Sequence, residues 1–554
     1  MTTSASNIKK DLFFLPLGGA GEIGMNLNLY RYDDQWLMVD LGVTFGHELG
    51  VEVIMPDPSY IVERRDKLKA LILTHAHEDH IGAVPYLWER LQCPIYATPF
   101  TATLVREKLK EAGLLGQAKV YEIKIGSQLS LPPFDLQFLT LTHSIPEPNA
   151  LAIRTPAGVV VHTGDWKLDP DPLIGDAADE AIFKDLGDKG VLALVCDSTN
   201  VFVEGNAGSE ATVRQRLIDF VSRQKEGRIV IACFASNVAR LESCAIAAQQ
   251  AGRQPVLVGR SMIRMNQAAR ANGYLKGLPT FLQEEDIAGL KREETLIICT
   301  GSQGEPRSAL ARMAAANHPR LKLSEGDTVL FSSRIIPGNE EEIRGMQEEL
   351  VDLGLTVIDA EQIEHIHVSG HPGREDLKKM YQWVRPQILV PVHGTLAHMR
   401  EQAKLGKSCG IPQAIVPKNG TLIKLSEEGP TLVETVKNGR LALDGSQVVP
   451  LFGPQMRDRA RLMTSGILFV TIAFDKRGHL REEPQITQMG VFESQSESEM
   501  IENLQDSVTE AIANTPHEQW SDDSTMKEIV RVACRRCVNA ERSKKPTTIV
   551  HITR

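Results

Sequence analysis

The segment Thr74–Ala83, THAHEDHIGA, places three histidines and an aspartate within six residues, directly after the apolar stretch KALILT. His75 and His77 stand two positions apart at the end of a predicted strand, so both imidazoles project to the same side and can bind one cation. The turn carries Asp79 and His80 toward a second cation. Imidazole nitrogen and carboxylate oxygen, without thiolate, favour Zn²⁺ or Mn²⁺ over a structural Cys-rich zinc site. The cluster therefore predicts a site for two divalent metal ions.

Four side chains would leave coordination positions open, so further ligands are expected at other strand ends. His143 follows the apolar strand FLTLT, and Asp165 follows VVVHTG, where its carboxylate could bridge both ions. Each alone would be an ordinary strand-end or turn residue, but their recurrence in this order favours metal binding. Asp40, at the end of WLMV, is a further strand-end acid that could orient a metal-bound histidine.

Composition excludes several classes of protein. Apolar residues make up 42% of the 554 residues and charged residues 24%, which is typical of a folded globular chain of about three or four domains. The net charge of −10 means that any site for a polyanion must be local. The sequence has no run of about 18 apolar residues and no secretory apolar region, so we expect a soluble, cytoplasmic protein without membrane contact.

Cysteine usage agrees with a reducing compartment. The eight cysteines are scattered from Cys93 to Cys537 without a disulfide framework. Cys534 and Cys537 form the one close pair, but no second CxxC accompanies them. They lie in EIVRVACRRCVNAE, which is typical of a helix with a buried stripe, so we predict that they pack in a helix rather than bind metal.

The pattern of strands changes twice along the chain. Residues 11–165 alternate short apolar strands with Gly, Pro and Asp turns, which indicates sheet packed against sheet. From about residue 191 strands and helices alternate, as in a parallel α/β domain, and after residue 360 the first style returns. The sequence predicts an α/β protein with a split catalytic domain, an inserted domain, and a small α/β tail domain.

These motifs resemble known families. The order Asp40, HxHxDH, His143 and Asp165 resembles the metallo-β-lactamase superfamily. Asp197 in VCDSTN, His371 in HVSGH and His393 in VPVHG are similar to the three extra motifs of its β-CASP group, whose members process nucleic acids. The stretches LPLGGAGEIGMN, TGSQGEP and SSRIIPGNE extend the resemblance to the bacterial ribonuclease J family over residues 12–400.

The resemblance implies a metallo-β-lactamase αβ/βα sandwich with an inserted parallel α/β β-CASP domain and a small α/β C-terminal domain. The implied boundaries are 1–208 and 361–450 for the two parts of the metallo-β-lactamase domain, 209–360 for the β-CASP insert, 451–465 for a linker and 466–554 for a C-terminal domain that serves self-association.

The resemblance also implies the roles of individual residues. His75, His77 and His143 would bind one metal ion, Asp79, His80 and His393 the other, and Asp165 would bridge them; Asp40 would support them. Asp197 would donate a proton, and His371 would accept one or bind phosphate. The substrate contacts would come from the turn His367, Val368, Ser369, Gly370 and His371, together with Ser236, Ser332 and Ser333.

The implied function is a two-metal ribonuclease that hydrolyses RNA phosphodiesters. It would act as a 5′ to 3′ exonuclease favouring 5′-monophosphorylated RNA, with additional endonuclease activity, in rRNA and mRNA maturation and decay. Two divalent ions per subunit are expected, Zn²⁺ first and Mn²⁺ or Mg²⁺ as alternatives. RNA, a second copy of the chain in a dimer or tetramer, and other RNA-decay proteins are the expected partners.

Two other functions remain open from the residues alone. A hydrolase of a small ester or thioester would need the metals but not the insert, His371 or His393. A metal-stabilised RNA-binding scaffold would need the fold but not the complete ligand set. Two departures from the family pattern, HPG at 371–373 and Thr395 after PVHG, bear on how the substrate is held.

Overall fold

The computed structural model describes residues 10–46, 48–336, 338–475, 479–493 and 497–554. The chain forms two compact units. The first comprises Met1–Thr44 and Ile54–Gly439, and the second comprises Phe45–Val53 and Arg440–Arg554. Over the described ranges, no helix combines the length and apolar character needed to cross a bilayer.

Two large mixed sheets form the centre of the first unit. In spatial order the first sheet is β24 (Thr431–Thr435), β23 (Thr421–Leu425), β1 (Leu12–Gly18), β3 (Leu27–Tyr32), β4 (Gln35–Val39), β7 (Leu68–Ile72), β8 (Ile95–Ala97) and β9 (Val120–Glu122). The second is β10 (Gln128–Leu131), β11 (Phe134–Thr140), β12 (Asn149–Thr155), β13 (Gly158–His162), β14 (Ala193–Asp197), β20 (Ile388–Val392) and β22 (Gln413–Ala414).

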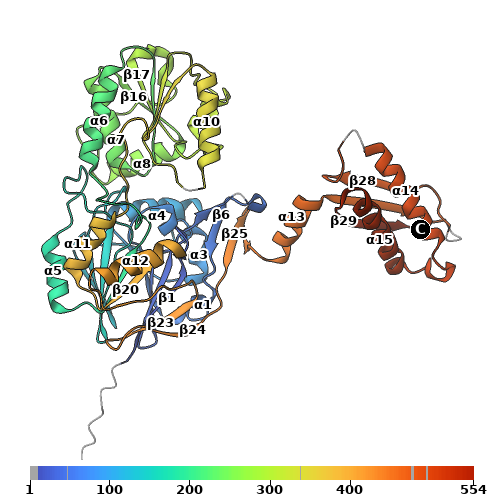
Figure 1. Cartoon of the computed structure of the whole chain (residues 1–554), viewed down its shortest axis with the longest axis horizontal. Helices are drawn as coiled ribbons and strands as arrows, with labels where there is room; N and C mark the ends of the chain where they lie inside the picture. Colours follow the sequence, from blue (N-terminus) through green and yellow to red (C-terminus); the bar gives the residue numbers. More distant parts are fainter. Residues whose placement is uncertain (1–9, 47, 337, 476–478, 494–496) are drawn as a thin grey trace, which may run out of the picture. The chain divides into compact units, whose positions relative to one another are not determined.

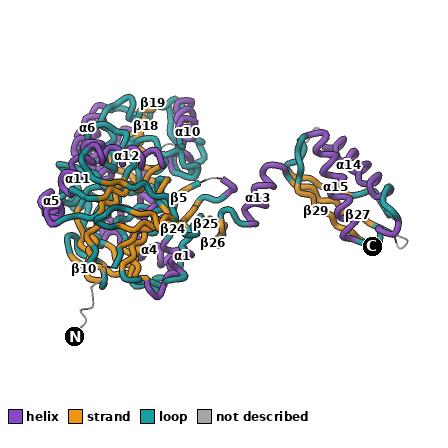
Figure 2. Tube along the Cα trace, turned by 60° about the horizontal axis from the view of Figure 1, so that its bottom comes forward, coloured by secondary structure: helices purple, strands orange, loops and turns teal. Residues whose placement is uncertain are grey.

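The two sheets face each other across one apolar core. Alternate residues of each strand point inward, as Leu12 and Phe14 of β1 do, and they meet Val160 and Val390 of the second sheet in a fully buried cluster. Helices cover the outer faces (Figure 2). They are α5 (Glu180–Lys189), α11 (Arg374–Val384) and α12 (Leu396–Ser408) on the second sheet, and α3 (Val84–Leu91) and α4 (Pro99–Glu111) near the first. This four-layer arrangement confirms the predicted sandwich.

The sandwich is interrupted between two neighbouring strands. β14 and β20 pair in parallel from Ala193↔Ile388 to Asp197↔Val392, and the chain between them leaves the sheet to build a separate α/β layer (Figure 1). Its sheet is entirely parallel, in the order β16 (Gln254–Val258), β17 (Thr295–Cys299), β15 (Ile229–Ala232), β18 (Thr328–Phe331) and β19 (Thr356–Ile358). Its helices are α6 (Glu210–Arg223), α7 (Val238–Gln250), α8 (Arg260–Ala271), α9 (Ala309–Ala314) and α10 (Glu340–Asp352).

The second unit ends in a small α/β layer. Its strands are β27 (Ile467–Ala473), β28 (Gln485–Met489) and β29 (Thr547–Thr553), and its helices are α14 (Glu497–Ala513) and α15 (Asp523–Arg542). Cys534 is buried on α15, in agreement with its prediction as a helix-packing residue.

The segment predicted as a linker, 451–465, is largely helical. Helix α13 spans Pro454–Ser465, with Gly453 at the N-cap and Pro454 at the first helical position, where a missing N–H has no cost. The second unit also begins earlier than the predicted tail domain, at Arg440, and takes in Phe45–Val53 from far upstream.

Candidate metal centre

The HxHxDH segment is a tight turn at the carboxyl end of β7. His77 is the N-cap of the short helix α2 (Glu78–Ile81), which carries Asp79 and His80. The backbone after β4 packs directly on this helix, because Leu41 N donates to His80 O at 2.7 Å. A Cβ on Gly42 would lie 1.6 Å from Asp79 O, so only glycine permits the approach.

Three histidines and one aspartate form the first group of potential ligands. His75, His77, His143 and Asp165 place one ligand atom each within 4.8 Å of one another. Nδ1 of His77 lies 3.2 Å from His75 Nε2 and 3.0 Å from His143 Nε2. Asp165 Oδ2 lies 3.9 Å from the Nε2 atoms of both His75 and His143. Three ring nitrogens that face one point are suited to a single cation.

A second group adjoins the first through Asp165. Asp79, His80, Asp165 and His393 also bring their ligand atoms within 4.8 Å. His393 Nε2 lies 2.9 Å from Asp79 Oδ2, and His80 Nε2 lies 3.2 Å from Asp165 Oδ2. His393 follows β20, beyond the insert, so the two parts of the split domain meet at this point.

The donor set fits two divalent ions. Asp165 Oδ1 is buried without a hydrogen-bond partner among the described residues, which is expected of an atom whose partner is a cation. Burial lowers the pKa of His77 to about 4 and the pKa values of His75 and His143 well below 6.5. These imidazoles therefore favour the neutral form that binds metals. Burial alone would raise the pKa of Asp165, but the His393 and His80 rings lower it to about 2, so its carboxylate stays ionised.

Each histidine of the two groups has a second ring nitrogen besides the one that lies closest to another ligand. Most of these second nitrogens have a partner of their own. Asp40, with φ of 64°, accepts a hydrogen bond from Thr74 N at 2.8 Å and lies 2.7 Å from His80 Nδ1. His143 Nδ1 lies 2.6 Å from Gly370 O, and His393 Nδ1 lies 2.8 Å from Thr199 Oγ1.

Ser236 is a partner of His77, which sequence reasoning did not identify. Its Oγ lies 3.1 Å from His77 Nε2, on the opposite side of the ring from the first group. Ser236 comes from the insert, directly after β15, whereas His77 comes from the sandwich. The inserted domain thus contacts a potential metal ligand directly. Nothing in the sequence links two residues that are 159 positions apart.

Asp197 and His371 form a third cluster beside Asp165 and His393. Asp197 ends β14 and is fully buried, and its Oδ2 lies 2.7 Å from His371 Nδ1. Its Oδ1 accepts hydrogen bonds from N and Oγ1 of Thr199, in the Asx-turn manner expected of a strand-end aspartate. His371 keeps its other ring nitrogen for a further partner.

The predicted phosphate-binding turn lies against the first group. Ser369 Oγ accepts hydrogen bonds from Asn200 Nδ2 at 2.6 Å and from His371 N at 3.1 Å. A Cβ on Gly370 would lie 2.7 Å from Cε1 of His143, so the turn contacts the ligand ring without space for a side chain.

Other predicted substrate contacts are less accessible. Ser332 and Ser333 are buried, and their hydroxyl groups donate to Ile366 O and Ser302 O. A serine has one hydroxyl proton, so neither has a free donor for a phosphate, which differs from the prediction. Val368 is buried against Gly208. Burial lowers the pKa of His367 to about 3, and its Nδ1 has no hydrogen-bond partner within the described residues.

The fold and the donor set together define a metallo-β-lactamase superfamily protein with a β-CASP insert. Comparison with family models agrees in each part of the chain. The matches are "Metallo-beta-lactamase superfamily" over residues 24–191, "Ribonuclease J, beta-CASP domain" over 226–350, "Zn-dependent metallo-hydrolase RNA specificity domain" over 357–416 and "Ribonuclease J C-terminal domain" over 454–554.

Relatives match over nearly the whole chain. Ribonuclease J of Sinorhizobium meliloti is 42% identical over 553 residues, 98% of each chain. Ribonuclease J of Helicobacter pylori strain B128 is 32% identical over 98% of this chain and 80% of its own. The chain belongs to the ribonuclease J family. A crystal structure of an Enterococcus faecalis protein of unknown function shares the fold, with a TM-score of 0.53 at 17% identity over 75% of this chain and 100% of its own.

Proposed function

We propose that this protein is a two-metal ribonuclease that degrades RNA from the 5′ end and also cleaves internally. Membership of the ribonuclease J family makes it a metal-dependent ribonuclease. The observation that carries the proposal of two metal ions is the convergence of two groups of potential ligands that share Asp165. A carboxylate shared by the two groups is suited to bridge two adjacent ions.

The ligands divide between the two positions. We assign His75, His77 and His143 to one ion and Asp79, His80 and His393 to the other, with Asp165 as the bridge; Asp40, Ser236, Thr199 and the Gly370 carbonyl orient the rings. Nitrogen-rich borderline ligands favour Zn²⁺, and Mn²⁺ or Mg²⁺ are alternatives. When bound, such a pair of ions lowers the pKa of a water molecule and offsets the charge that develops on a phosphate.

Proton transfer is assigned to Asp197 and His371. The 3′ oxygen that leaves the phosphorus needs a proton as its bond breaks. The His371 side chain is 22% exposed and can reach a substrate, whereas Asp197 is buried and holds the ring by its Nδ1 atom. His371 ends the turn 367–371 and contacts Asp197, so the backbone N–H groups and the Ser369 hydroxyl of this turn would lie near the scissile phosphate.

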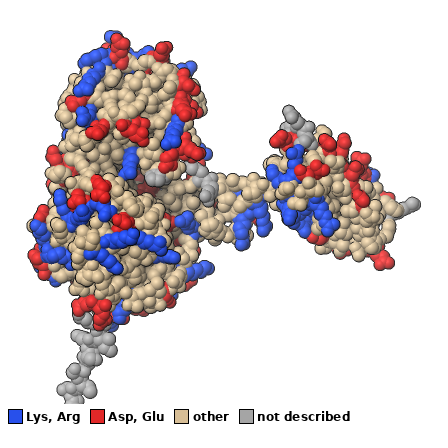
Figure 3. Space-filling view, viewed as in Figure 1, with Lys and Arg blue, Asp and Glu red and all other residues tan. Residues whose placement is uncertain are grey.

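We expect RNA binding to depend on a local site rather than on the overall charge of the protein. Lys and Arg side chains are interspersed with Asp and Glu over the face of the first unit in Figure 3, and the chain carries a net charge of −10. A 5′ monophosphate preference requires a second phosphate site, one nucleotide from the scissile phosphate. The proposed setting is the cytoplasm, in maturation and decay of rRNA and mRNA, alone or with other RNA-decay proteins.

Self-association is proposed for the C-terminal part. Ile467 and Phe469 of β27 stand beside Met489 and Ile549 on the neighbouring strands. Three of these, Phe469, Met489 and Ile549, are exposed, which is unusual for a sheet with helices on its other face. We infer that this face pairs two copies of the chain, in a dimer or as one interface of a tetramer.

The test uses the metal-loaded full chain and one RNA sequence in three forms: 5′-monophosphorylated, 5′-triphosphorylated and circular. Release of mononucleotides from the first, slower from the second, is the expected exonuclease result, and linearisation of the circle reports internal cleavage. EDTA should stop all three reactions. Intact RNA together with hydrolysis of a thioester or a lactam would overturn the proposal, and so would tight RNA binding without cleavage.

A further inference from the structure

Arg240 is a fully buried cation that the proposed mechanism does not use. It lies in the first turn of α7 with 1% of its surface exposed. Nε and Nη2 donate to Oε2 and Oε1 of Glu210, at 3.1 and 2.9 Å, in a bidentate pair. Nη1 donates to the carbonyl and the hydroxyl oxygen of Ser332, at 2.7 and 2.8 Å, and to Ile366 O at 3.3 Å.

The backbone of Glu210, rather than its carboxylate, is connected to the sandwich. Glu210 is the first residue of α6, and its N–H donates to Asp169 Oδ2 at 3.1 Å. Asp169 also pairs with the buried Lys167, whose Nζ lies 3.1 Å from Oδ2 and donates to Gly208 O. Lys167 and Asp169 follow the bridging residue Asp165 by two and four positions. Glu210 therefore joins the insert to a segment that carries a proposed ligand.

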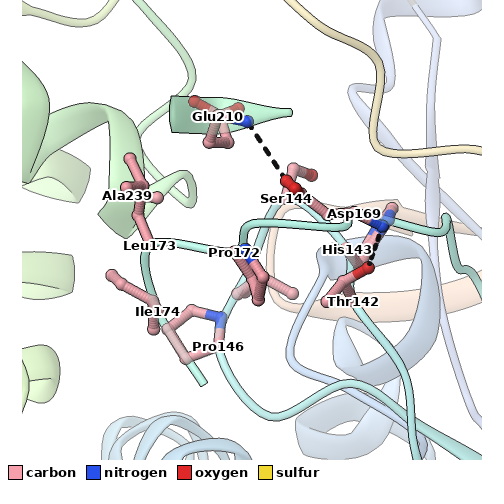
Figure 4. A pocket seen from close by; sticks show the side chains of 11 residues that line it. Thr142, His143, Ser144, Pro146, Asp169, Pro172, Leu173, Ile174, Glu210 and Ala239 are labelled. Carbon is pink, nitrogen blue, oxygen red and sulfur yellow. Dashed lines mark hydrogen bonds between the residues drawn. The ribbon is translucent and has the colours of Figure 1, made fainter. Parts of the chain in front are cut away.

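The guanidinium is connected to the 367–371 turn. Ile366, whose carbonyl accepts from Arg240, immediately precedes the 367–371 turn. Asn237 donates to Glu210 Oε1 at 2.9 Å and follows Ser236, the partner of His77. Figure 4 shows Glu210 and Ala239 of the insert beside His143 and Asp169 of the sandwich, around one small pocket.

Stability alone is a poor explanation for such a pair. Removing two charges from water costs about as much as their attraction returns, so a buried ion pair is weak evidence of net stabilisation. Arg253 offers a comparison in the same domain. It is 3% exposed and donates to three backbone carbonyls, those of Gly227, Thr295 and Gln224, with no connection to the site.

We propose that Glu210 and Arg240 are positioning residues for catalysis: their ion pair fixes the 367–371 turn and Ser236 over the metal ligands without touching metal or substrate. The expected effect of the pair on the rate of catalysis rests on the proposed function. The expected effect on the order of the 367–371 turn does not. A displacement of about 1 Å at a reacting centre costs up to a hundredfold in rate.

The decisive variant is Arg240→Lys, which keeps the charge and loses the planar fork, and Arg253→Lys is its matched control. We expect Arg240→Lys to retain two metal ions per chain, to lower kcat about tenfold to a hundredfold, and to change KM less than about threefold. Arg253→Lys should lower Tm comparably and leave kcat unchanged. Hydrogen exchange over residues 361–375 should be faster in Arg240→Lys than in Arg253→Lys.

The outcomes separate the two proposals. An RNA-inactive wild-type protein with faster exchange in Arg240→Lys contradicts the proposed function and supports the positioning role. Unchanged exchange and a kcat within twofold of wild type overturn the positioning role, as does an equal loss of kcat in Arg253→Lys. If Arg240→Lys does not fold, Ser332→Ala is the deciding variant. It removes one hydrogen-bond acceptor of Arg240 and leaves no charged group without its partner. It should lower kcat several-fold, and an unchanged kcat overturns the proposal.

Discussion

The Nδ1 atom of His371 lies 2.7 Å from Oδ2 of Asp197, and the two side chains differ sharply in exposure, at 22% and 0%. A buried carboxylate that binds one nitrogen of a partly exposed imidazole fixes the orientation of the ring and leaves the other nitrogen for the substrate. The sequence-based assignment gave the donor role to Asp197. The geometry favours His371 as the group that reaches the substrate and Asp197 as its orienting partner.

His371→Ala should therefore keep both metal ions and lower kcat by about 10²- to 10⁴-fold, the usual contribution of a general acid or base. Metal analysis and kcat on monophosphorylated RNA check this. Asp197→Asn should also keep the metals and lose rate, because it no longer holds the ring as a carboxylate. An unchanged kcat in His371→Ala would remove this residue from the mechanism.

His77→Ala should abolish turnover by a different route. The variant removes a ring that faces both His75 and His143, so we expect less than two equivalents of metal and no detectable RNA cleavage. Elemental analysis of the purified protein measures the loss. His479→Ala is the control, since its side chain is 59% exposed and lies in the second unit. Full metal content in an inactive His77→Ala protein would contradict the ligand assignment.

Ser236→Ala tests the contact between the insert and a ligand. Loss of a partner that orients a metal-bound histidine typically costs 10- to 100-fold in metal affinity or activity, and we expect a loss in that range. Competition with a chelator gives the affinity, and kcat gives the activity. Ser130→Ala, in an exposed strand where the hydroxyl donates to Asp135, should leave both unchanged. Equal behaviour of the two variants would show that Ser236 does not hold His77.

Gly370→Ala should disturb the turn by steric contact. The added methyl group would lie 2.7 Å from the His143 ring, and overpacking of this kind costs about 1 to 3 kcal/mol. We expect kcat to fall at least tenfold, because the ring and the turn must separate. The control is Gly345→Ala on α10, where a Cβ meets nothing within 4 Å and helix propensity improves. A fully active Gly370→Ala protein would show that the turn can shift freely.

Glu210→Gln should change the pH dependence of stability. Burial alone would raise the pKa of Glu210, but Arg240 lowers it below the ordinary value of 4.5. A depressed pKa gives stability that is fully present above about pH 4.5 and is lost as pH falls through the lower folded-state value. We expect the variant to be less stable by about 3 to 5 kcal/mol at pH 7. Urea unfolding should show this difference shrinking below pH 4.5; a constant difference down to pH 3 would contradict it.

Local pattern was sufficient for much of the fold and for the candidate ligands from His75 to Asp165, whereas the role of His393 came from the resemblance to the β-CASP group. The apolar strand before His75 and the strand ends at His143, Asp165 and His393 are visible in the sequence, because alternation and punctuation are local properties. The helix α13 was missed because PLFGPQMRDRAR has turn residues at its start and few apolar positions. In the structure, Gly453 and Pro454 form the start of this helix.

Long-range partners could not be predicted in the same way. Glu210 and Arg240 are 30 positions apart and Ser332 lies 92 positions beyond Arg240, so no periodicity connects them. Sequence reasoning assigned Ser332 and Ser333 to the substrate from their residue type and place at a strand end. In the structure both side chains are buried. Which side chains are buried depends on elements far away in the chain.

The parallel pairing of β14 with β20 has a consequence for synthesis. His75 to Asp165 leave the ribosome early, but β20 and the following His393 emerge only after the whole insert has been translated. A chain that ends before β20 therefore has Asp79, His80 and Asp165 of the second group but lacks His393. The proposed metal centre is complete only when the strand that closes the sheet has been synthesised.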